Sequence, residues 1–133
     1  MLTETRGYIN LHAYPALLLP AGMPHMEVSR EPFDLDCFSR DYSLRDVTGL
    51  DPRVVAHVSN QANAAKAVRE AVIMVETDHY ADFAFVCHGG THRSGACVML
   101  CAVLAYPHGE IRMHTSRTAR AWWRAYGLMV YEP

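Results

Sequence analysis

The chain has 133 residues, of which half are hydrophobic and a fifth are charged, so it forms one domain, residues 1–133, with a substantial core. Its formal charge of −2 disfavours a long nucleic acid as the main ligand. The charge is unevenly divided: residues 1–87 carry seven basic and twelve acidic side chains, and residues 88–133 carry five and two.

The positive C-terminal third either favours an anionic ligand or reflects ordinary scatter of surface charge. No apolar stretch is long enough to span a membrane, and the start, MLTETR, lacks the basic region of a signal peptide. The four cysteines form no C-x-x-C pair, and Cys97 and Cys101 lie within an apolar run. We therefore expect a reduced, cytoplasmic protein in which these two thiols are buried.

The first half of the chain predicts two strands separated by an irregular arm. Residues 7–14 (GYINLHAY) are typical of a strand, whereas residues 15–32 hold four prolines and indicate a loop. Residues 32–38 (PFDLDCF) alternate apolar and acidic side chains, which predicts a strand with one face outward. In the following TGLDP segment, Gly49 indicates a turn, Asp51 a helix cap, and Pro52 the first helical position.

The second half alternates helices and strands. Residues 63–80 have apolar side chains at helical spacing, which predicts one buried face: Ala64, Ala67, Val68, Ala71, Val72 and Val75. Residues 82–87 predict a strand covered on both faces, and the uncharged residues 94–106 a helix buried nearly all round. A last strand is predicted at 111–118, followed by a helix or an irregular tail. This alternation predicts an α/β fold with a largely parallel sheet and flanking helices.

The loop between residues 82–87 and 94–106 is the candidate site, because ligands bind at the carboxyl ends of parallel strands. Gly89 and Gly90 let backbone N–H groups approach an anion, and the next helix adds its positive end. Arg93 offers a fork for two phosphate oxygens. The candidate ligand-binding residues are His88, Gly89, Gly90, Thr91, His92, Arg93 and Ser94.

Two simpler interpretations of this loop stay open. One is a plain turn between strand and helix, with the arginine facing water. The other is a metal site at Cys87, His88 and His92, but no second cluster of ligands supports it, so we predict no metal and no cofactor.

The spacing of Cys87 and Arg93, with RSGA after the loop, resembles the signature of the cysteine-dependent phosphatases. That resemblance implies a Cys87 thiolate that attacks phosphorus, Arg93 as a phosphate clamp, and a separate Asp as general acid. The sequence departs from this pattern at Val86, where the family usually has His. Asp78 and Asp82 lie at the far end of the strand, and Asp46 or Asp51 would have to approach from the LRDVTGLDP turn.

A second resemblance covers residues 32–118. LRDVTGLD followed by CHGGTHRSGA resembles the C-terminal domain of the bacterial RapZ family, in which LR-x-x-TGLD precedes a C-x-GG-x-HRS loop. The resemblance implies an α/β domain whose loop binds an amino-sugar phosphate through His88, Gly89, Gly90, His92 and Arg93. It also implies self-association and contact with small regulatory RNAs.

The chain departs from the RapZ pattern in three ways. It has no P-loop, which suggests a free-standing version of the domain, and Asp36 replaces the basic residue of the family's FD-x-R. The first 30 residues match poorly, so a ligand-contacting histidine of the family maps only loosely onto His12 or His25.

The leading interpretation is a sensor or adaptor that binds a small phosphorylated metabolite at Cys87–Ser94 without catalysis, with Cys87 packed as an inert thiol. Further candidate contacts are His12, His25, Arg45, His114 and Arg117. One alternative is the phosphatase. Another is an RNA-binding or self-association module that uses the basic and aromatic residues near the C-terminus, namely Arg112, Arg117, Arg120, Trp122, Trp123, Arg124 and Tyr126. Those residues equally suit an amphipathic helix that packs on the sheet.

Overall fold

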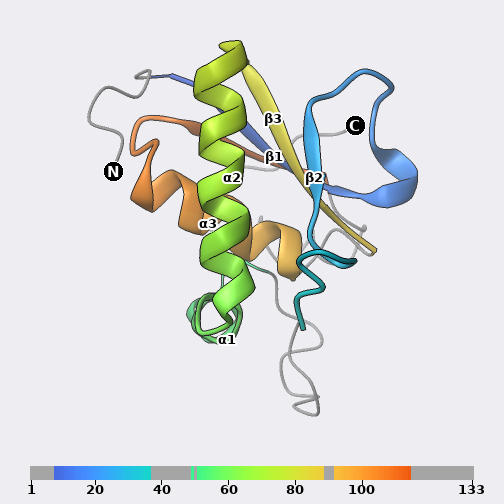
Figure 1. Ribbon diagram of the computed structural model, residues 1–133, viewed down its shortest axis with the longest axis vertical. Helices are drawn as coiled ribbons and strands as arrows, with labels where there is room; N and C mark the ends of the chain where they lie inside the picture. Colours follow the sequence, from blue (N-terminus) through green and yellow to red (C-terminus); the bar gives the residue numbers. More distant parts are fainter. Residues whose placement is uncertain (1–7, 37–48, 50, 89–91, 115–133) are drawn as a thin grey trace.

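A computed structural model describes residues 8–36, 49, 51–88 and 92–114. Within these residues a parallel sheet has the strand order β2-β3-β1-β4 (Figure 1). The α/β fold class and the parallel sheet predicted from the sequence are confirmed. The elements, in chain order, are β1 (Asn10–Pro15), the short 3-10 helix η1 (Ala16–Leu18), β2 (His25–Glu27), α1 (Pro52–Ser59), α2 (Ala62–Asp78), β3 (Asp82–Cys87), α3 (Arg93–Leu104) and β4 (Glu110–Met113).

The strand order and the handedness of the connections decide which face of the sheet each segment covers. The connections β2 to β3 and β3 to β4 cross the sheet in one direction, and both run through helices. Right-handed crossovers therefore put α1, α2 and α3 on the same face, with α2 in front of the strands in Figure 1. The step from β1 to β2 runs the other way, so residues 16–24 fall on the opposite face, where Leu19 and Met23 pack.

The main core lies between the sheet and the helices. Side chains alternate along a strand, so Leu11 and Ala13 of β1 and Phe83 and Phe85 of β3 face the helices. Ala84 and Val86 of β3 face the other way, beneath residues 16–24. The predicted coverage of residues 82–87 on both faces is confirmed.

Helices α1 and α2 form as the local sequence predicts. Asp51 caps α1 by accepting a hydrogen bond from the Arg53 backbone N–H at 2.9 Å, and Pro52 occupies the first helical position. The six residues predicted for the buried face of α2 are all buried. In the part of the chain that the structure describes, no helix has both the length and the apolar character needed to cross a membrane.

Three sequence predictions need correction. Residues 32–36 are not a strand, although the predicted alternation persists as buried Phe33 and Leu35 between exposed acidic residues. Strand β2 lies within the segment predicted as a loop, because its three residues are ordered by pairing with β3. The last turn of α3 is not buried all round, since Val103 and Leu104 are about two-thirds exposed, at 68% and 67%. Residues 37–38, 115–118 and the predicted tail lie outside the described residues.

Candidate functional site

The predicted unit of strand, loop and helix is present at the carboxyl edge of the sheet. Strand β3 ends at Cys87, which lies in register with Pro15 at the end of β1, and α3 begins at Arg93. His88 is exposed and His92 is half-buried, whereas Gly89, Gly90 and Thr91 lie outside the described residues. Both ends of the candidate loop are therefore fixed by regular elements of the fold.

Gly49 joins the TGLD segment to this unit. A Cβ atom added at Gly49 would lie 2.3 Å from the His92 carbonyl oxygen and 2.4 Å from the Ala96 nitrogen, both in the backbone at the start of α3. A Cβ atom added at Gly95, in the same turn, would lie 3.1 Å from the Gly49 Cα. The two sequence motifs are thus in direct backbone contact, which only residues without a Cβ allow.

The Arg93 side chain is held by the segment that follows β2. Its Nη1 donates a hydrogen bond to the Leu35 carbonyl oxygen at 3.1 Å, and the Leu35 backbone N–H in turn donates to the Val28 carbonyl oxygen at 2.8 Å. Within the described residues the buried Nε of Arg93 has no hydrogen-bond partner. The guanidinium is therefore oriented by one backbone acceptor and retains donor capacity for another group.

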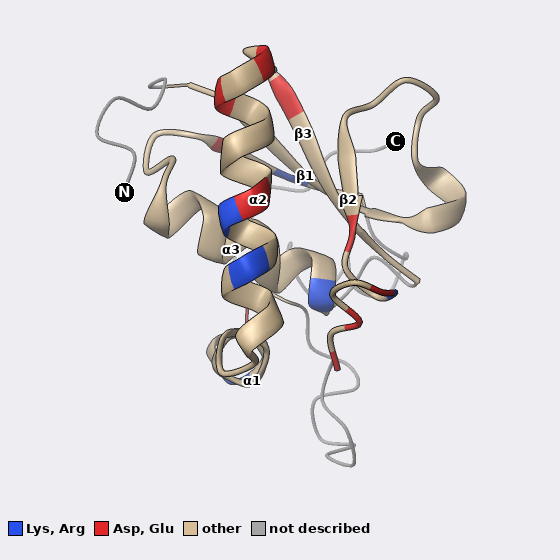
Figure 2. Cartoon of the chain, viewed as in Figure 1, with Lys and Arg blue, Asp and Glu red and all other residues tan. Residues whose placement is uncertain are grey.

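Basic and acidic residues both lie around this end of the sheet. Figure 2 shows both basic and acidic residues on α2, a basic residue on the first turn of α3, and acidic residues along the segment after β2. Asp36 of that segment lies 3.2 Å from His57 Nε2, so its carboxylate contacts the end of α1. The Asp that replaces the basic residue of the RapZ pattern therefore has a partner of its own.

The Cys87 thiol is packed between β3 and α3. The residue is 2% exposed, and its Sγ donates to the Oγ of Ser94 at 3.2 Å. Ser94 is fully buried. This contact joins the end of β3 to the first turn of α3, and it uses both side chains for packing.

Neither Asp51 nor Asp82 is placed as a general acid for Cys87. Asp51 caps α1, and its carboxylate also accepts hydrogen bonds from the Arg53 guanidinium at 3.0 Å. Those bonds hold the pKa of Asp51 below its usual range, so the group stays ionised near neutral pH. Asp82 opens β3 at the far end of the strand, as the sequence predicted.

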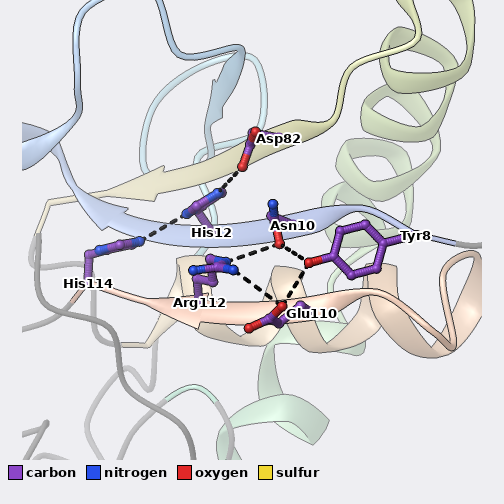
Figure 3. A network of polar contacts seen from close by, with 7 residues as sticks. All are labelled: Tyr8, Asn10, His12, Asp82, Glu110, Arg112 and His114. Atoms are coloured by element: carbon purple, nitrogen blue, oxygen red, sulfur yellow. Dashed lines mark hydrogen bonds and ion pairs between the residues drawn. The ribbon is translucent and has the colours of Figure 1, made fainter.

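Two of the further candidates, His12 and His114, meet on the sheet face that lies opposite the helices (Figure 3). His12 Nδ1 is 2.9 Å from His114 Nε2, and His12 Nε2 is 2.8 Å from Asp82 Oδ1. The Tyr14 ring stacks on the His114 ring, with centroids 3.9 Å apart and planes 4° apart. The described contacts thus join His12 and His114 to each other, His12 to Asp82, and His114 to Tyr14.

The remaining candidates are dispersed. His25 begins β2 and contacts the Met23 carbonyl oxygen through Nδ1 at 2.9 Å. Arg112 donates from Nε to Asn10 Oδ1 at 3.0 Å and lies 3.3 Å from Glu110, as Figure 3 shows, so it belongs to an internal network. The other predicted contacts lie outside the described residues: Arg45, Arg117, Arg120, Trp122, Trp123, Arg124 and Tyr126.

Sequence reasoning missed Tyr14, Asp82 and the Leu35 carbonyl as partners of candidate residues. One signal was available: Asn10, His12 and Tyr14 alternate with apolar residues along β1, which indicates a second, polar face. A backbone acceptor such as Leu35 leaves no signal, because every residue carries one.

A hollow of about 410 Å³ lies between α2 and the end of α3, away from the loop. Its lining is almost wholly apolar, with Arg69 as the single charged residue, so it does not suit a phosphate. Among the described residues, no group of three or more potential metal ligands comes together. Comparison with protein-family models and with curated proteins finds no match to this sequence.

Proposed function

We propose that this domain binds a small phosphorylated metabolite at the loop between β3 and α3 and acts as a cytoplasmic sensor or adaptor without catalysis. The observation that carries the proposal is the placement of Arg93. It stands in the first turn of α3 at the carboxyl edge of a parallel sheet, is oriented by the Leu35 carbonyl, and has a buried Nε without a partner among the described residues. Such an arginine suits an anion that arrives at this edge.

The expected strength of binding fits a metabolite. A hydrogen bond to a charged group contributes about 1.5–3 kcal/mol, and a helix N-terminus adds about 0.3–1 kcal/mol. One phosphate held by Arg93 and by backbone N–H groups would then bind with a Kd on the order of millimolar to micromolar. That range matches the concentrations at which metabolites are sensed.

The surroundings of Cys87 support binding over covalent catalysis. Its thiol is buried and hydrogen-bonded to Ser94, whereas a nucleophile must present its sulfur to the phosphorus atom. The phosphatase mechanism also needs a protonated acid, and Asp51 is held ionised by Arg53. These two observations rank the phosphatase below the binding module.

The resemblance to the RapZ C-terminal domain supports an amino-sugar phosphate as the ligand class. Asp36 stands where that family has a basic residue, so this chain offers one positive contact fewer. We therefore expect weaker binding than a site with two basic side chains would give, or a preference for a ligand with fewer negative charges.

The proposal is tested by calorimetric titration with an amino-sugar phosphate, the matching hexose phosphate and the unphosphorylated amino sugar. Arg93→Ala should weaken binding of the phosphates at least tenfold, because it removes a charge-assisted hydrogen bond of about 1.5–3 kcal/mol. Arg69→Ala is the matched control, since it removes an exposed arginine of α2. Equal affinities of the Arg93 variant and wild type, or equal binding of the unphosphorylated sugar, would refute the proposal.

The same titration distinguishes a binding module from a phosphatase. Cys87→Ser should keep the affinity of wild type within about a factor of two, which is less than 0.5 kcal/mol. Hydrolysis of p-nitrophenyl phosphate by wild type that disappears in Cys87→Ser would instead establish the phosphatase.

A further inference from the structure

Three strands contribute to a chain of hydrogen bonds on the face opposite the helices, in which both histidines are buried and the Asp82 side chain is 43% exposed. Asp82 opens β3, His12 lies in the middle of β1, and His114 follows the last residue of β4 (Figure 3). His12 and His114 are only 6% and 4% exposed. The binding loop described above uses neither histidine.

The tautomers of both rings follow from the geometry when Asp82 is ionised. A carboxylate can only accept, so His12 Nε2 must carry a proton and donate it to Asp82 Oδ1 at 2.8 Å. In neutral His12 the Nδ1 atom is then an acceptor. The 2.9 Å contact therefore requires His114 Nε2 to carry the proton that lies between the two rings.

Acid acts on this hydrogen-bond chain by adding protons to the two histidine rings. The neutral pair has two protons on four nitrogens, one of them between the rings. A third proton can enter at His114 Nδ1, and the bridging proton remains in place. A fourth would put N–H groups on both His12 Nδ1 and His114 Nε2, and these would face each other across 2.9 Å without an acceptor.

The surroundings of the two rings act on their protonation in opposite directions. Burial disfavours the cation and lowers the pKa of His12, and Arg112 of β4 acts in the same sense, while Asp82 and Glu110 oppose it. The Tyr14 ring lies flat against His114, an arrangement that favours an imidazolium. Residues 16–24, which pack against Tyr14 through Leu19 and Met23, carry no charged side chain. Burial is the largest of the effects on His12.

We propose that Asp82, His12 and His114 form a proton-controlled clamp that holds β4 against β1 near neutral pH and loosens it in mild acid. Among the described strands β4 pairs with β1 alone, so the clamp acts on an edge strand of four residues. Directly after β4, the His114 backbone N–H donates to the Ala13 carbonyl oxygen of β1 at 2.9 Å. That bond belongs to the same residue whose ring takes part in the clamp.

The direction in which pH shifts the closure of the clamp follows from the difference in histidine pKa between the clamped and released states. The folded state depresses the pKa of His12, so once released the ring binds more protons in mild acid than when clamped. Closure is therefore fully favourable above the ordinary histidine pKa of about 6.5 and weakens as the pH falls below it. The opening constant is the equilibrium ratio of released to clamped β4. It rises about thirtyfold between pH 7.5 and 5 if one histidine stays neutral while clamped and titrates with its ordinary pKa once released.

The test is hydrogen exchange of single amides in the intact chain, corrected for the intrinsic pH dependence of exchange. The reporter is the His114 N–H, and the matched control is the Val28 N–H, which follows the other edge strand and donates to Val86 at 2.8 Å. From pH 7.5 to 5 the opening constant of His114 should rise several-fold more than that of Val28, up to about thirtyfold per histidine. Equal responses of the two amides would overturn the clamp.

Two variants and one spectroscopic measurement separate the clamp from general acid instability. His114→Gln offers an N–H donor to neutral His12 and, with its amide turned, an oxygen acceptor to protonated His12. The opposed N–H groups are then avoided, so the acid response should shrink by severalfold. His108→Gln removes an exposed histidine from the turn before β4 and should leave the response unchanged. If the first variant does not fold, ¹⁵N spectra of wild type decide: both rings must carry the proton on Nε2 at pH 8, and a His114 protonated on Nδ1 there would refute the proposal.

Discussion

Replacement of Gly49 by alanine tests whether the TGLD segment and the start of α3 are in backbone contact. The new Cβ would lie 2.3, 2.4 and 2.6 Å from His92 O, Ala96 N and Gly95 C, where ordinary contact begins near 3.4 Å. These are backbone atoms that cannot rotate away, so the first turn of α3 would have to shift by about 1 Å. The φ angle of Gly49 is not in the left-handed region, and steric crowding is therefore the only penalty.

The magnitude is set by two opposing effects. Overpacking of this kind costs about 1–3 kcal/mol, while alanine recovers about 0.4–1 kcal/mol by restricting the unfolded chain. We expect Gly49→Ala to lower the free energy of unfolding by about 1–2 kcal/mol in urea denaturation. Gly109→Ala is the graded control, because its nearest contacts are 3.1 to 3.2 Å and call for a much smaller shift. A Gly49→Ala protein as stable as wild type would refute the contact and the link between the motifs.

The remaining predictions concern the cap of α1 and the buried thiols. Asp51→Ala should cost about 1 kcal/mol of unfolding free energy, and Asp51→Asn much less, because asparagine caps equally well. The lowered pKa of Asp51 places its stabilisation above the unfolded value of about 3.9, and it should disappear as the pH falls through the lower folded pKa, which acid titration of wild type and Asp51→Asn checks. Burial raises the pKa of Cys101 to about 12 and that of Cys97 further, so iodoacetamide at pH 8 should label neither until the chain unfolds. Rapid labelling of either thiol in the folded protein would contradict their burial.

Local sequence signals predicted the helices well, because helix formation depends on neighbours within one or two turns. The buried face of α2 and the cap at Asp51 follow from residues three or four apart. Strand pairing is a property of distant segments, and here sequence reasoning was less accurate. The pattern at 32–36 correctly predicted which side chains are buried, but none of the described strands pairs with this segment. Strand β2 has a partner in β3 but too few residues to produce a pattern.

The candidate loop was recognisable because its residues are consecutive, whereas the histidine clamp was not. His12 and His114 are 102 residues apart, and their contact depends on the parallel pairing of β1 with β4. The sequence suggested both as additional ligand contacts. In the structure they contact each other, and the third member is Asp82, which the sequence indicated only as an unsuitable acid. A pairwise contact across strands becomes visible only when the register is known.

Alternation along one strand makes the two proposed functions separable. Strand β1 directs Leu11 and Ala13 toward the helices and His12 and Tyr14 toward the opposite face. The candidate loop between β3 and α3 lies on the helix side of the sheet, because Arg93 belongs to α3, and the histidine clamp lies on the other side. A conservative change of the clamp therefore leaves the donors of the loop in place, so His114→Gln should bind phosphate as wild type does at pH 8. A change in both properties would mean that the carboxyl edge of the sheet moves as one unit.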